Sequence, residues 1–212
     1  MAKKVSITVI RRLPKYHRYL NELEAKGIDR VSSQDLSVLT GFTASQIRQD
    51  FNNFGGFGQQ GYGYNVRDLK MNIEKIMGYN NPKKTVMVGV GKLGQAIARY
   101  QRFDDAGMEL VGLFDRNKNN IGKVIQGIEV QSMDNFEKFL QENDIQIGII
   151  TASGDSAQEL TDKFVNSGIK GIWNFATVDL NVPDDVYVED VRLMDSLLTL
   201  SYFVVKGQNE NK

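Results

Sequence analysis

The sequence of 212 residues contains no cysteine and only one histidine. The lack of cysteine excludes disulfides, thiolate metal sites and thiol-based redox sensing. The single histidine, His17, leaves little scope for a metal cluster or for histidine-based catalysis, so we expect no metal. No apolar run approaches the roughly 18 residues of a membrane helix, and the N-terminus lacks the apolar region of a secretory signal. These absences predict a cytoplasmic protein with no membrane partner.

The composition that remains is ordinary for a globular protein, with 41% hydrophobic and 25% charged residues. The net charge is zero, but it is unevenly spread. Residues 1–80 hold 12 basic and 7 acidic residues, and the rest of the chain carries the balancing negative charge. A basic N-terminal module is typical of nucleic-acid binding, although a difference of this size also arises by chance.

A strand, a tight turn and the start of a helix are predicted from Val86 to Gly94. Gly89, Gly91 and Gly94 form a G-x-G-x-x-G pattern, in which glycines permit a tight turn, close approach of a pyrophosphate and close packing of helix on strand. Asp115 ends the next predicted strand, 21 residues beyond Gly94. A carboxylate there accepts from both ribose hydroxyls and repels a 2′-phosphate. The combination predicts NAD(H) binding, although a glycine turn alone also occurs for structural reasons.

From Lys83 onward, predicted strands and helices alternate, which is typical of a doubly wound parallel α/β sheet of the Rossmann type. The predicted strands are 85–90, 109–114, 126–130, 146–151, 169–175 and 186–188, with helices over 93–103, 134–142 and 155–167. Ligands bind at the carboxyl ends of such strands. We therefore expect a cofactor to be held by Gly89, Val90, Gly91, Lys92, Leu93, Gly94, Asp115, Thr151, Ala152, Asn174 and Phe175.

Helical patterns fill most of the N-terminal part. One apolar face spans residues 5–25, a short helix follows Ser32, and a capping box at Thr43–Gln46 opens a third helix. A short helix, a glycine turn and a capped helix predict a helix-turn-helix. The polar side chains of the third helix are placed to read base edges in the major groove; they are Ser45, Gln46, Arg48 and Gln49. The alternative is a helical hairpin with a solvated face.

A segment with five glycines among nine residues follows, with aromatic side chains between them. We interpret residues 55–64 as a wing against the DNA backbone or minor groove, with a flexible linker as the alternative. A helix over 66–77 completes this part. Arg12 and Arg18 lie in a basic segment of the first helix, where they contact phosphate, pair between domains or simply face solvent.

These patterns divide the chain into a winged helix-turn-helix domain (1–80), a Rossmann domain (81–190) and a C-terminal helix (191–207). The last helix is apolar on nearly every side, and such a helix needs burial on more than one side. It either packs into its own domain or is exchanged with a second subunit. We expect a dimerisation helix in a homodimer.

Together the motifs resemble the Rex family of redox-sensing transcriptional repressors over nearly the whole chain. The matching segments are Arg12–Tyr16, Ser32–Leu36, Gln46–Asp50, Phe54–Gly58, Gly61–Asn65, Gly89–Gly94, Phe114–Asp115, Gly168–Ile172, Asn174–Ala176 and Leu200–Phe203. The resemblance implies a homodimer with winged-helix heads and Rossmann cores, whose last helix is swapped into the partner. It also implies that the protein binds a palindromic operator when NADH is low and releases it when NADH binds.

The resemblance also assigns roles to individual residues. It places Arg48 and Gln49 on the recognition helix, and Gln59, Gln60, Tyr62 and Tyr64 on the wing. It places Tyr100 near the nicotinamide and puts Arg18 in a switch contact with Tyr100 and an acid of the last helix.

Three departures from the family pattern bear on these roles. Gln49 replaces a lysine, and Gln59 and Gln60 replace a basic pair, so phosphate contact should weaken. Arg192 replaces the acid of the switch contact. Arg18 would then repel Arg192, which predicts a blunted NADH response. The alternative is that Asp190 or Asp195 supplies the carboxylate, although neither occupies the matching position.

Two other classes of function compete with a DNA-binding repressor. An NAD-dependent oxidoreductase needs a proton donor or acceptor near the nicotinamide, and no histidine lies in the Rossmann part. A CoA- or nucleotide-binding module leaves the wing glycines and the capped helix unexplained. We therefore predict a regulator without catalytic residues, with a Rex paralogue of altered effector response as an alternative.

Overall fold

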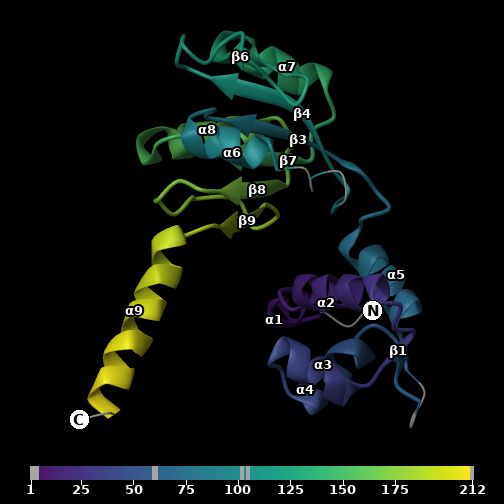
Figure 1. Ribbon diagram of the computed structural model, residues 1–212. Coiled ribbons are helices and arrows are strands. Elements are labelled where there is room, and N and C mark those ends of the chain that lie inside the picture. Colours follow the sequence, from purple (N-terminus) through teal and green to yellow (C-terminus); the bar gives the residue numbers. More distant parts are fainter. Residues whose placement is uncertain (1–4, 59–61, 101–102, 104–105, 211–212) are drawn as a thin grey trace. The chain divides into compact units, whose positions relative to one another are not determined.

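The computed structural model describes residues 5–58, 62–100, 103 and 106–210. Contacts along the chain divide it into two units, Met1–Asn81 and Pro82–Lys212. Figure 1 labels most of the helices and strands of each unit. Among the residues so described, no helix has both the length and the apolar character needed to cross a bilayer.

Five helices and a two-stranded antiparallel sheet make up the described N-terminal unit. They are α1 (Ile7–Ile10), α2 (Leu13–Ala25), β1 (Arg30–Val31), α3 (Ser33–Thr40), α4 (Ala44–Asn52), β2 (Tyr64–Asn65) and α5 (Val66–Met77). The predicted helix over 5–25 is interrupted at Arg11 and Arg12. Pro14 lies in the first turn of α2, where its missing N–H costs nothing. The short β1–β2 ladder had no signal in the sequence.

Capping side chains define the helix-turn-helix. The Ser32 hydroxyl accepts from the Asp35 N–H at 3.0 Å, and the Asp35 carboxylate accepts from the Ser32 N–H at 3.0 Å. Gly41 turns the chain after α3 with φ of 72°, a region that favours glycine. The Thr43 hydroxyl then accepts from the Gln46 N–H at 3.2 Å and begins α4. The predicted helix-turn-helix is therefore present, with its second helix starting where the sequence placed it.

A seven-stranded sheet with strand order β5-β6-β4-β3-β7-β8-β9 forms the centre of the C-terminal unit. The strands are β3 (Lys83–Val88), β4 (Met108–Asp115), β5 (Val124–Ile125), β6 (Ile128–Ser132), β7 (Ile147–Ile150), β8 (Gly171–Asn174) and β9 (Tyr187–Asp190). Within this sheet, β5 pairs antiparallel with β6, and the other neighbouring strands pair parallel. Counted from β3, the parallel strands have the order 3-2-1-4-5-6, which is that of dinucleotide-binding Rossmann folds.

The predicted strand over 126–130 is wrong at its start. Gln126 and Gly127 have φ of 49° and 79°, so they form the turn of the β5–β6 hairpin. Two successive residues with positive φ are typical of tight hairpin turns. The parallel strand therefore begins only at Ile128.

Helices cover both faces of the sheet. They are α6 (Lys92–Ala98), the 3₁₀ turn η2 (Met133–Asn135), α7 (Phe136–Glu142) and α8 (Gly154–Asn166), whereas α9 (Leu193–Glu210) follows β9 and projects away from the sheet. On one face, α7 and α8 bury Phe136, Leu160 and Phe164 against the strands. On the other, α6 buries Ala98 beside Met87. Helix α6 ends at Ala98, five residues before the predicted end.

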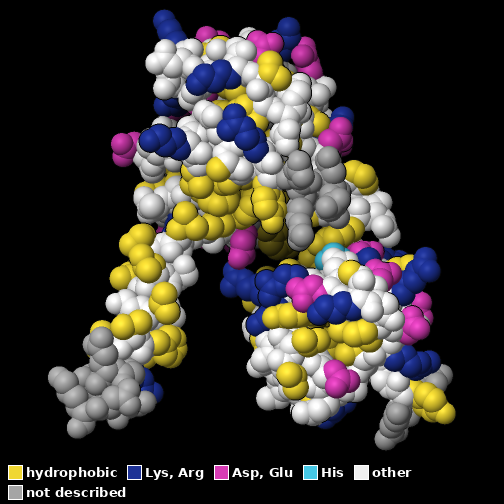
Figure 2. Space-filling model, viewed as in Figure 1, with side chains coloured by type: hydrophobic (Ala, Val, Ile, Leu, Met, Phe, Trp, Pro, Cys, Tyr) yellow, Lys and Arg dark blue, Asp and Glu magenta, His cyan; other side chains and the backbone are white. Residues whose placement is uncertain are grey.

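Helix α9 leaves its apolar side chains in the open. The large apolar residues from Leu193 to Val205 are 53–62% exposed, and Figure 2 shows hydrophobic side chains spread along this helix. Its own unit therefore does not bury it, which overturns the alternative that the helix packs into its own domain.

Candidate functional site

A crevice of about 270 Å³ lies at the carboxyl ends of β3, β4 and β7. Its lining residues are Val88, Gly89, Gly91, Asp115, Arg116, Asn117, Asn120, Thr151, Ala152, Ser153, Ser156 and Leu160. The glycine loop, the acid after β4 and the residues after β7 therefore meet at one site. This is the edge of the sheet at which the sequence placed the ligand.

The three motif glycines have different structural reasons. Gly89 has φ of 97°, and a Cβ built on it would meet the Ala152 nitrogen at 2.6 Å. A Cβ on Gly94 would overlap the carbonyl oxygen of Gly89, so α6 packs directly on the loop. By contrast, no described atom lies within 4 Å of a Cβ built on Gly91. A side chain at Gly89 or Gly94 would therefore force backbone to move, whereas the space at Gly91 is open to a ligand.

Asp115 is already engaged by three donors. One carboxylate oxygen accepts from the Val90 N–H and the Asn120 side-chain amide, both at 2.8 Å, and the other accepts from the Asn117 N–H at 2.8 Å. A carboxylate has about four acceptor positions. One position therefore remains for a ribose hydroxyl, in place of the two that we expected. The bond to Val90 also makes Asp115 a support for the glycine loop.

Thr151 holds the opposite wall of the crevice to the same loop. Its hydroxyl lies 2.5 Å from the Gly89 carbonyl oxygen and 3.2 Å from that of Val88. The predicted residues Thr151 and Ala152 are therefore at the crevice, but the Thr151 hydroxyl is used within the protein.

The rim holds charged residues that sequence reasoning missed. The Arg116 guanidinium donates to the Glu159 carboxylate at 2.8 Å and lies 3.5 Å from the Ser156 hydroxyl. This contact lowers the pKa of the Glu159 carboxyl. The available signal was that Arg116 directly follows Asp115.

Asn174 and Phe175, which we expect to contact the cofactor, are not among the residues that line the crevice, and both make contacts within their own unit. Asn174 is fully buried; its amide donates to Asp190 at 2.7 Å and to the Val178 carbonyl at 3.0 Å. Phe175 packs edge-on against Trp173, with ring centroids 4.6 Å apart. Lys92 and Leu93 are exposed at the start of α6, and Val90 is buried.

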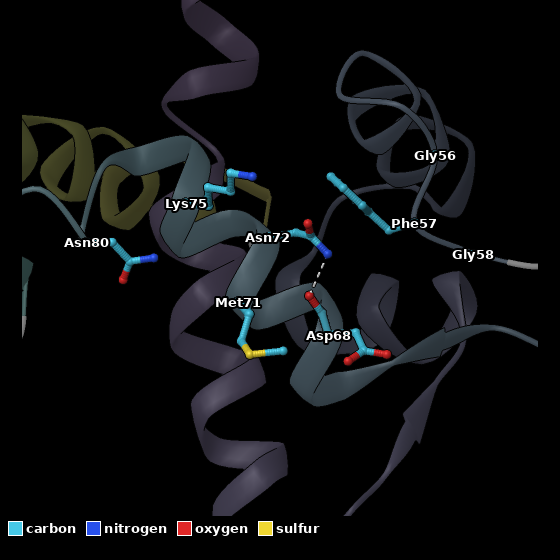
Figure 3. Close-up of a pocket in the computed structure, with 8 residues that line it drawn as sticks. All are labelled: Gly56, Phe57, Gly58, Asp68, Met71, Asn72, Lys75 and Asn80. Atoms are coloured by element: carbon cyan, nitrogen blue, oxygen red, sulfur yellow. Dashed lines mark hydrogen bonds between the residues drawn. The ribbon is translucent and has the colours of Figure 1, made fainter.

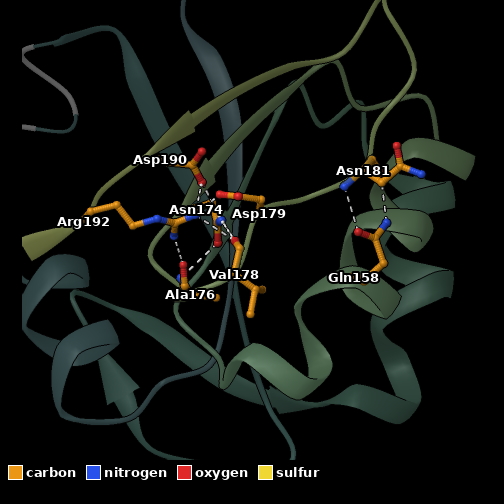
Figure 4. A network of polar contacts seen from close by, with 8 residues as sticks. All are labelled: Gln158, Asn174, Ala176, Val178, Asp179, Asn181, Asp190 and Arg192. Carbon is orange, nitrogen blue, oxygen red and sulfur yellow. Dashed lines mark hydrogen bonds and ion pairs between the residues drawn. The ribbon is translucent and has the colours of Figure 1, made fainter. Parts of the chain in front are cut away.

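Arg192 joins the loop after β8 to the start of α9 (Figure 4). Its guanidinium donates to the carbonyls of Ala176 and Val178, the latter at 2.8 Å. It pairs with Asp190 at 3.0 Å and Asp179 at 3.1 Å. The positive charge of Arg192 is therefore balanced by two carboxylates of its own unit. For this reason we no longer expect Arg192 to repel Arg18.

The other two residues of the predicted switch are exposed. Tyr100 is 62% exposed just beyond α6. Arg18, in the N-terminal unit, stacks over the Tyr19 ring at 5.0 Å.

The outer face of α4 is polar and exposed. Ser45, Arg48 and Gln49 are exposed, and Gln46 is half-buried. The Arg48 guanidinium donates to the Ser33 hydroxyl of α3 at 2.8 Å, which orders a long side chain before any partner arrives.

Two residues expected at DNA belong to the interior. Tyr64 is 8% exposed and packs edge-on against Phe51, with ring centroids 5.1 Å apart. The Arg12 guanidinium is turned inward to Asp50, with its side chain 13% exposed. Tyr62 is 70% exposed, as a contact residue requires. Gln59 and Gln60 lie outside the described residues.

A larger hollow of about 620 Å³ lies in the N-terminal unit, between the segment Gly56–Gly58 and α5 (Figure 3). Its other lining residues are Asp68, Met71, Asn72, Lys75 and Asn80. The Asn72 amide is used in a bond to the Asp68 carbonyl at 2.8 Å. Gly56 and Gly58 line the hollow and Asp68 lies in the first turn of α5, but none of the lining residues follows a strand of the parallel sheet. Size alone therefore does not identify the site. Within the described chain, no group of three or more His, Cys, Asp or Glu residues is placed to hold a metal.

Comparison with known proteins matches both units. Residues 4–52 match the family described as "Putative DNA-binding protein N-terminus", and residues 80–178 match the CoA-binding domain family. The redox-sensing transcriptional repressor Rex of Clostridioides difficile (strain 630) is 53% identical over 97% of this chain and 98% of its own length. That of Clostridium perfringens (strain SM101 / Type A) is 52% identical over 95% of each chain.

Solved structures agree with these relatives. A structure of RSP in complex with β-NAD⁺ and operator DNA is 50% identical, with a TM-score of 0.91 over 99% of this chain and 96% of that one. A structure of RSP with β-NADH is 47% identical, with a TM-score of 0.91 over 99% of this chain and 98% of that one. A third RSP structure, described as that of a Rex-family repressor, is 48% identical with a TM-score of 0.89 over 97% of this chain and 96% of that one.

Proposed function

The chain belongs to the Rex family of redox-sensing transcriptional repressors, and from this premise we propose that it is an NADH-sensing repressor of transcription and not an enzyme. One observation carries the proposal. A crevice with an open glycine and an acid after the second strand occurs in the same chain as a helix-turn-helix with an exposed polar face. The first feature suits a dinucleotide, and the second suits a DNA groove.

At the crevice, NAD(H) is the proposed ligand. The pyrophosphate approaches the backbone at Gly91 and the start of α6, where N–H groups face an anion. Asp115 accepts from a ribose hydroxyl through its remaining position, and its charge disfavours the 2′-phosphate of NADP(H). When bound, the cofactor supplies a nicotinamide whose charge differs between NAD⁺ and NADH. We place Tyr100 and Arg18 at the contact that responds to that difference.

At the DNA, the exposed face of α4 enters the major groove. Arg48 and Gln49 read base edges, while Tyr62 and the neighbouring wing residues contact the backbone. A homodimer presents two such helices to a palindromic operator, and the exposed apolar face of α9 gives the partner subunit a surface to cover. A repressor acts where its DNA lies, and in bacteria such as Clostridioides difficile this is the cytoplasm. We therefore propose that this chain acts in the cytoplasm.

Switching requires that NADH and NAD⁺ bind two dimer geometries with different affinities. In this chain Arg192 links the loop after β8 to α9. Movement at the carboxyl end of β8 is thereby passed to the start of the dimerisation helix. We propose that this link, in place of an acid at the same position, connects cofactor binding to the dimer.

Operator binding with the two cofactor forms tests the proposal. Fluorescence anisotropy would compare the operator duplex of the RSP complex with a shuffled duplex, while NAD⁺ and NADH are titrated separately. We expect preference for the operator, retained with NAD⁺ and lost with NADH. A chain that does not distinguish the duplexes, or that ignores both nicotinamide forms, would overturn it.

A further inference from the structure

A buried carboxylate lies on the face of α4 opposite its exposed side chains. Asp50 is 1% exposed. It accepts hydrogen bonds from the Arg12 Nε and Nη2 atoms and from the Tyr16 hydroxyl, each at 2.6 Å. Arg12 is the N-cap residue of α2 and Tyr16 lies within α2. Three charge-assisted hydrogen bonds therefore tie the DNA-reading helix to α2.

Stability alone does not account for this network. A buried ion pair often stabilises a fold no more than apolar residues of the same volume, because desolvation offsets the attraction. The neighbours Ile47 and Phe51 on the same face of α4 are apolar and fully buried. Such contacts are non-directional and tolerate small rotations. Hydrogen bonds require particular angles, and the Arg12 fork fixes two of them at once.

A small rotation of α4 matters for reading DNA. Side-chain tips lie roughly 5–6 Å from a helix axis, so a rotation of about 10° displaces them by about 1 Å. Binding constellations need positions held to about 0.5 Å. Arg48 and Gln49 lie within two residues of Asp50 and turn with it.

We propose that Asp50, held by Arg12 and Tyr16, is a positioning residue for operator reading. It fixes the rotation of α4 about its axis so that Arg48 and Gln49 meet base edges. Arg12 thus acts on DNA through Asp50. This inference rests on the proposed function, because it takes α4 as the helix that reads DNA.

The Tyr16→Phe variant tests the proposal with the least disturbance. It removes one donor to Asp50 and keeps the ring that packs against Phe42 and Phe51 at centroid distances of 5.6 and 5.0 Å. Tyr19→Phe is the matched control, since the Tyr19 hydroxyl makes no hydrogen bond to any residue that the structure describes. The full chain would be titrated with the RSP operator duplex and with a shuffled duplex over a range of salt concentrations.

We expect Tyr16→Phe to lower the ratio of operator to shuffled affinity by at least about fivefold, the low end of what one base contact contributes. Shuffled-duplex affinity and the salt dependence should stay unchanged, because phosphate contacts remain. If the melting curve of Asp50→Asn shows a folded protein, this variant should lower the ratio further. If Asp50→Asn does not fold, the Tyr16→Phe result alone decides whether the proposal holds.

Two results would overturn the positioning role. One is an unchanged ratio in folded Tyr16→Phe protein, whether both affinities stay the same or fall equally. The other is an equal fall of the ratio in Tyr19→Phe. If the unaltered chain fails to prefer the operator, the proposed function itself is refuted, which separates the two failures.

Discussion

Alanine at Gly91 should mainly weaken cofactor binding and alanine at Gly94 should mainly destabilise the fold, although the two glycines belong to one motif. A Cβ on Gly91 meets no described atom within 4 Å, whereas a Cβ on Gly94 overlaps the Gly89 carbonyl oxygen. Gly91→Ala should therefore fold, at a cost of about 0.5–1 kcal/mol for replacing the helix N-cap glycine. The new methyl occupies the approach of the pyrophosphate and should weaken NADH binding by about 1–3 kcal/mol, as overpacking does.

Gly94→Ala should instead destabilise the Rossmann unit. Backbone must move to admit the methyl, which costs at least about 1–3 kcal/mol and lowers Tm by roughly 2–4 °C for each kcal/mol. Thermal unfolding measures the stability of both variants, and calorimetry measures NADH affinity for those that fold. Wild-type NADH affinity in Gly91→Ala, or wild-type Tm in Gly94→Ala, would refute this account of the motif.

Three further changes test other parts of the structure. Asp115→Ala removes the acceptor shared by Val90 and a ribose hydroxyl, so NADH affinity should fall by about 1.5–3 kcal/mol in a chain that still folds; unchanged calorimetric affinity would exclude the role. Arg48→Ala should lower operator affinity by about 1–3 kcal/mol at fixed salt, and full binding in a gel shift would place Arg48 away from DNA. Burial, with the bond to Asp50, raises the pKa of Tyr16, so the folded chain keeps this proton to higher pH than the unfolded chain. That stabilisation is complete below the unfolded pKa near 10 and falls above it by about 1.4 kcal/mol per pH unit; urea unfolding from pH 9 to 11 should show this decline, and an identical decline in Tyr16→Phe would contradict it.

The fold could be predicted from the sequence wherever neighbouring residues determine the local structure. The caps at Ser32 and Thr43 and the alternation of strands and helices predicted the helix-turn-helix and the parallel sheet. Failures occurred where a signal was short or ambiguous. Gln126 and Gly127 lie between the apolar residues Ile125 and Ile128 and form a turn. The two-residue β1–β2 ladder depends on tertiary pairing alone.

The site was predictable in position but not in detail. Gly91 and Asp115 follow from spacing, because strand ends of a parallel sheet share one edge. The three donors on Asp115, the inward turn of Arg12 and the pairing of Arg192 depend on residues distant in sequence. No spacing rule indicates whether an arginine faces solvent, DNA or a buried carboxylate.

The most direct test of cofactor control is NADH-driven release of operator DNA by Gly91→Ala, measured beside the unaltered chain. In the absence of cofactor both should bind the operator equally. The NADH concentration that releases half of the DNA should rise in Gly91→Ala by the same factor as its Kd for NADH, because binding at the crevice and release are linked. Release at the same NADH concentration, despite weakened NADH binding, would contradict control of the DNA-binding unit by this crevice.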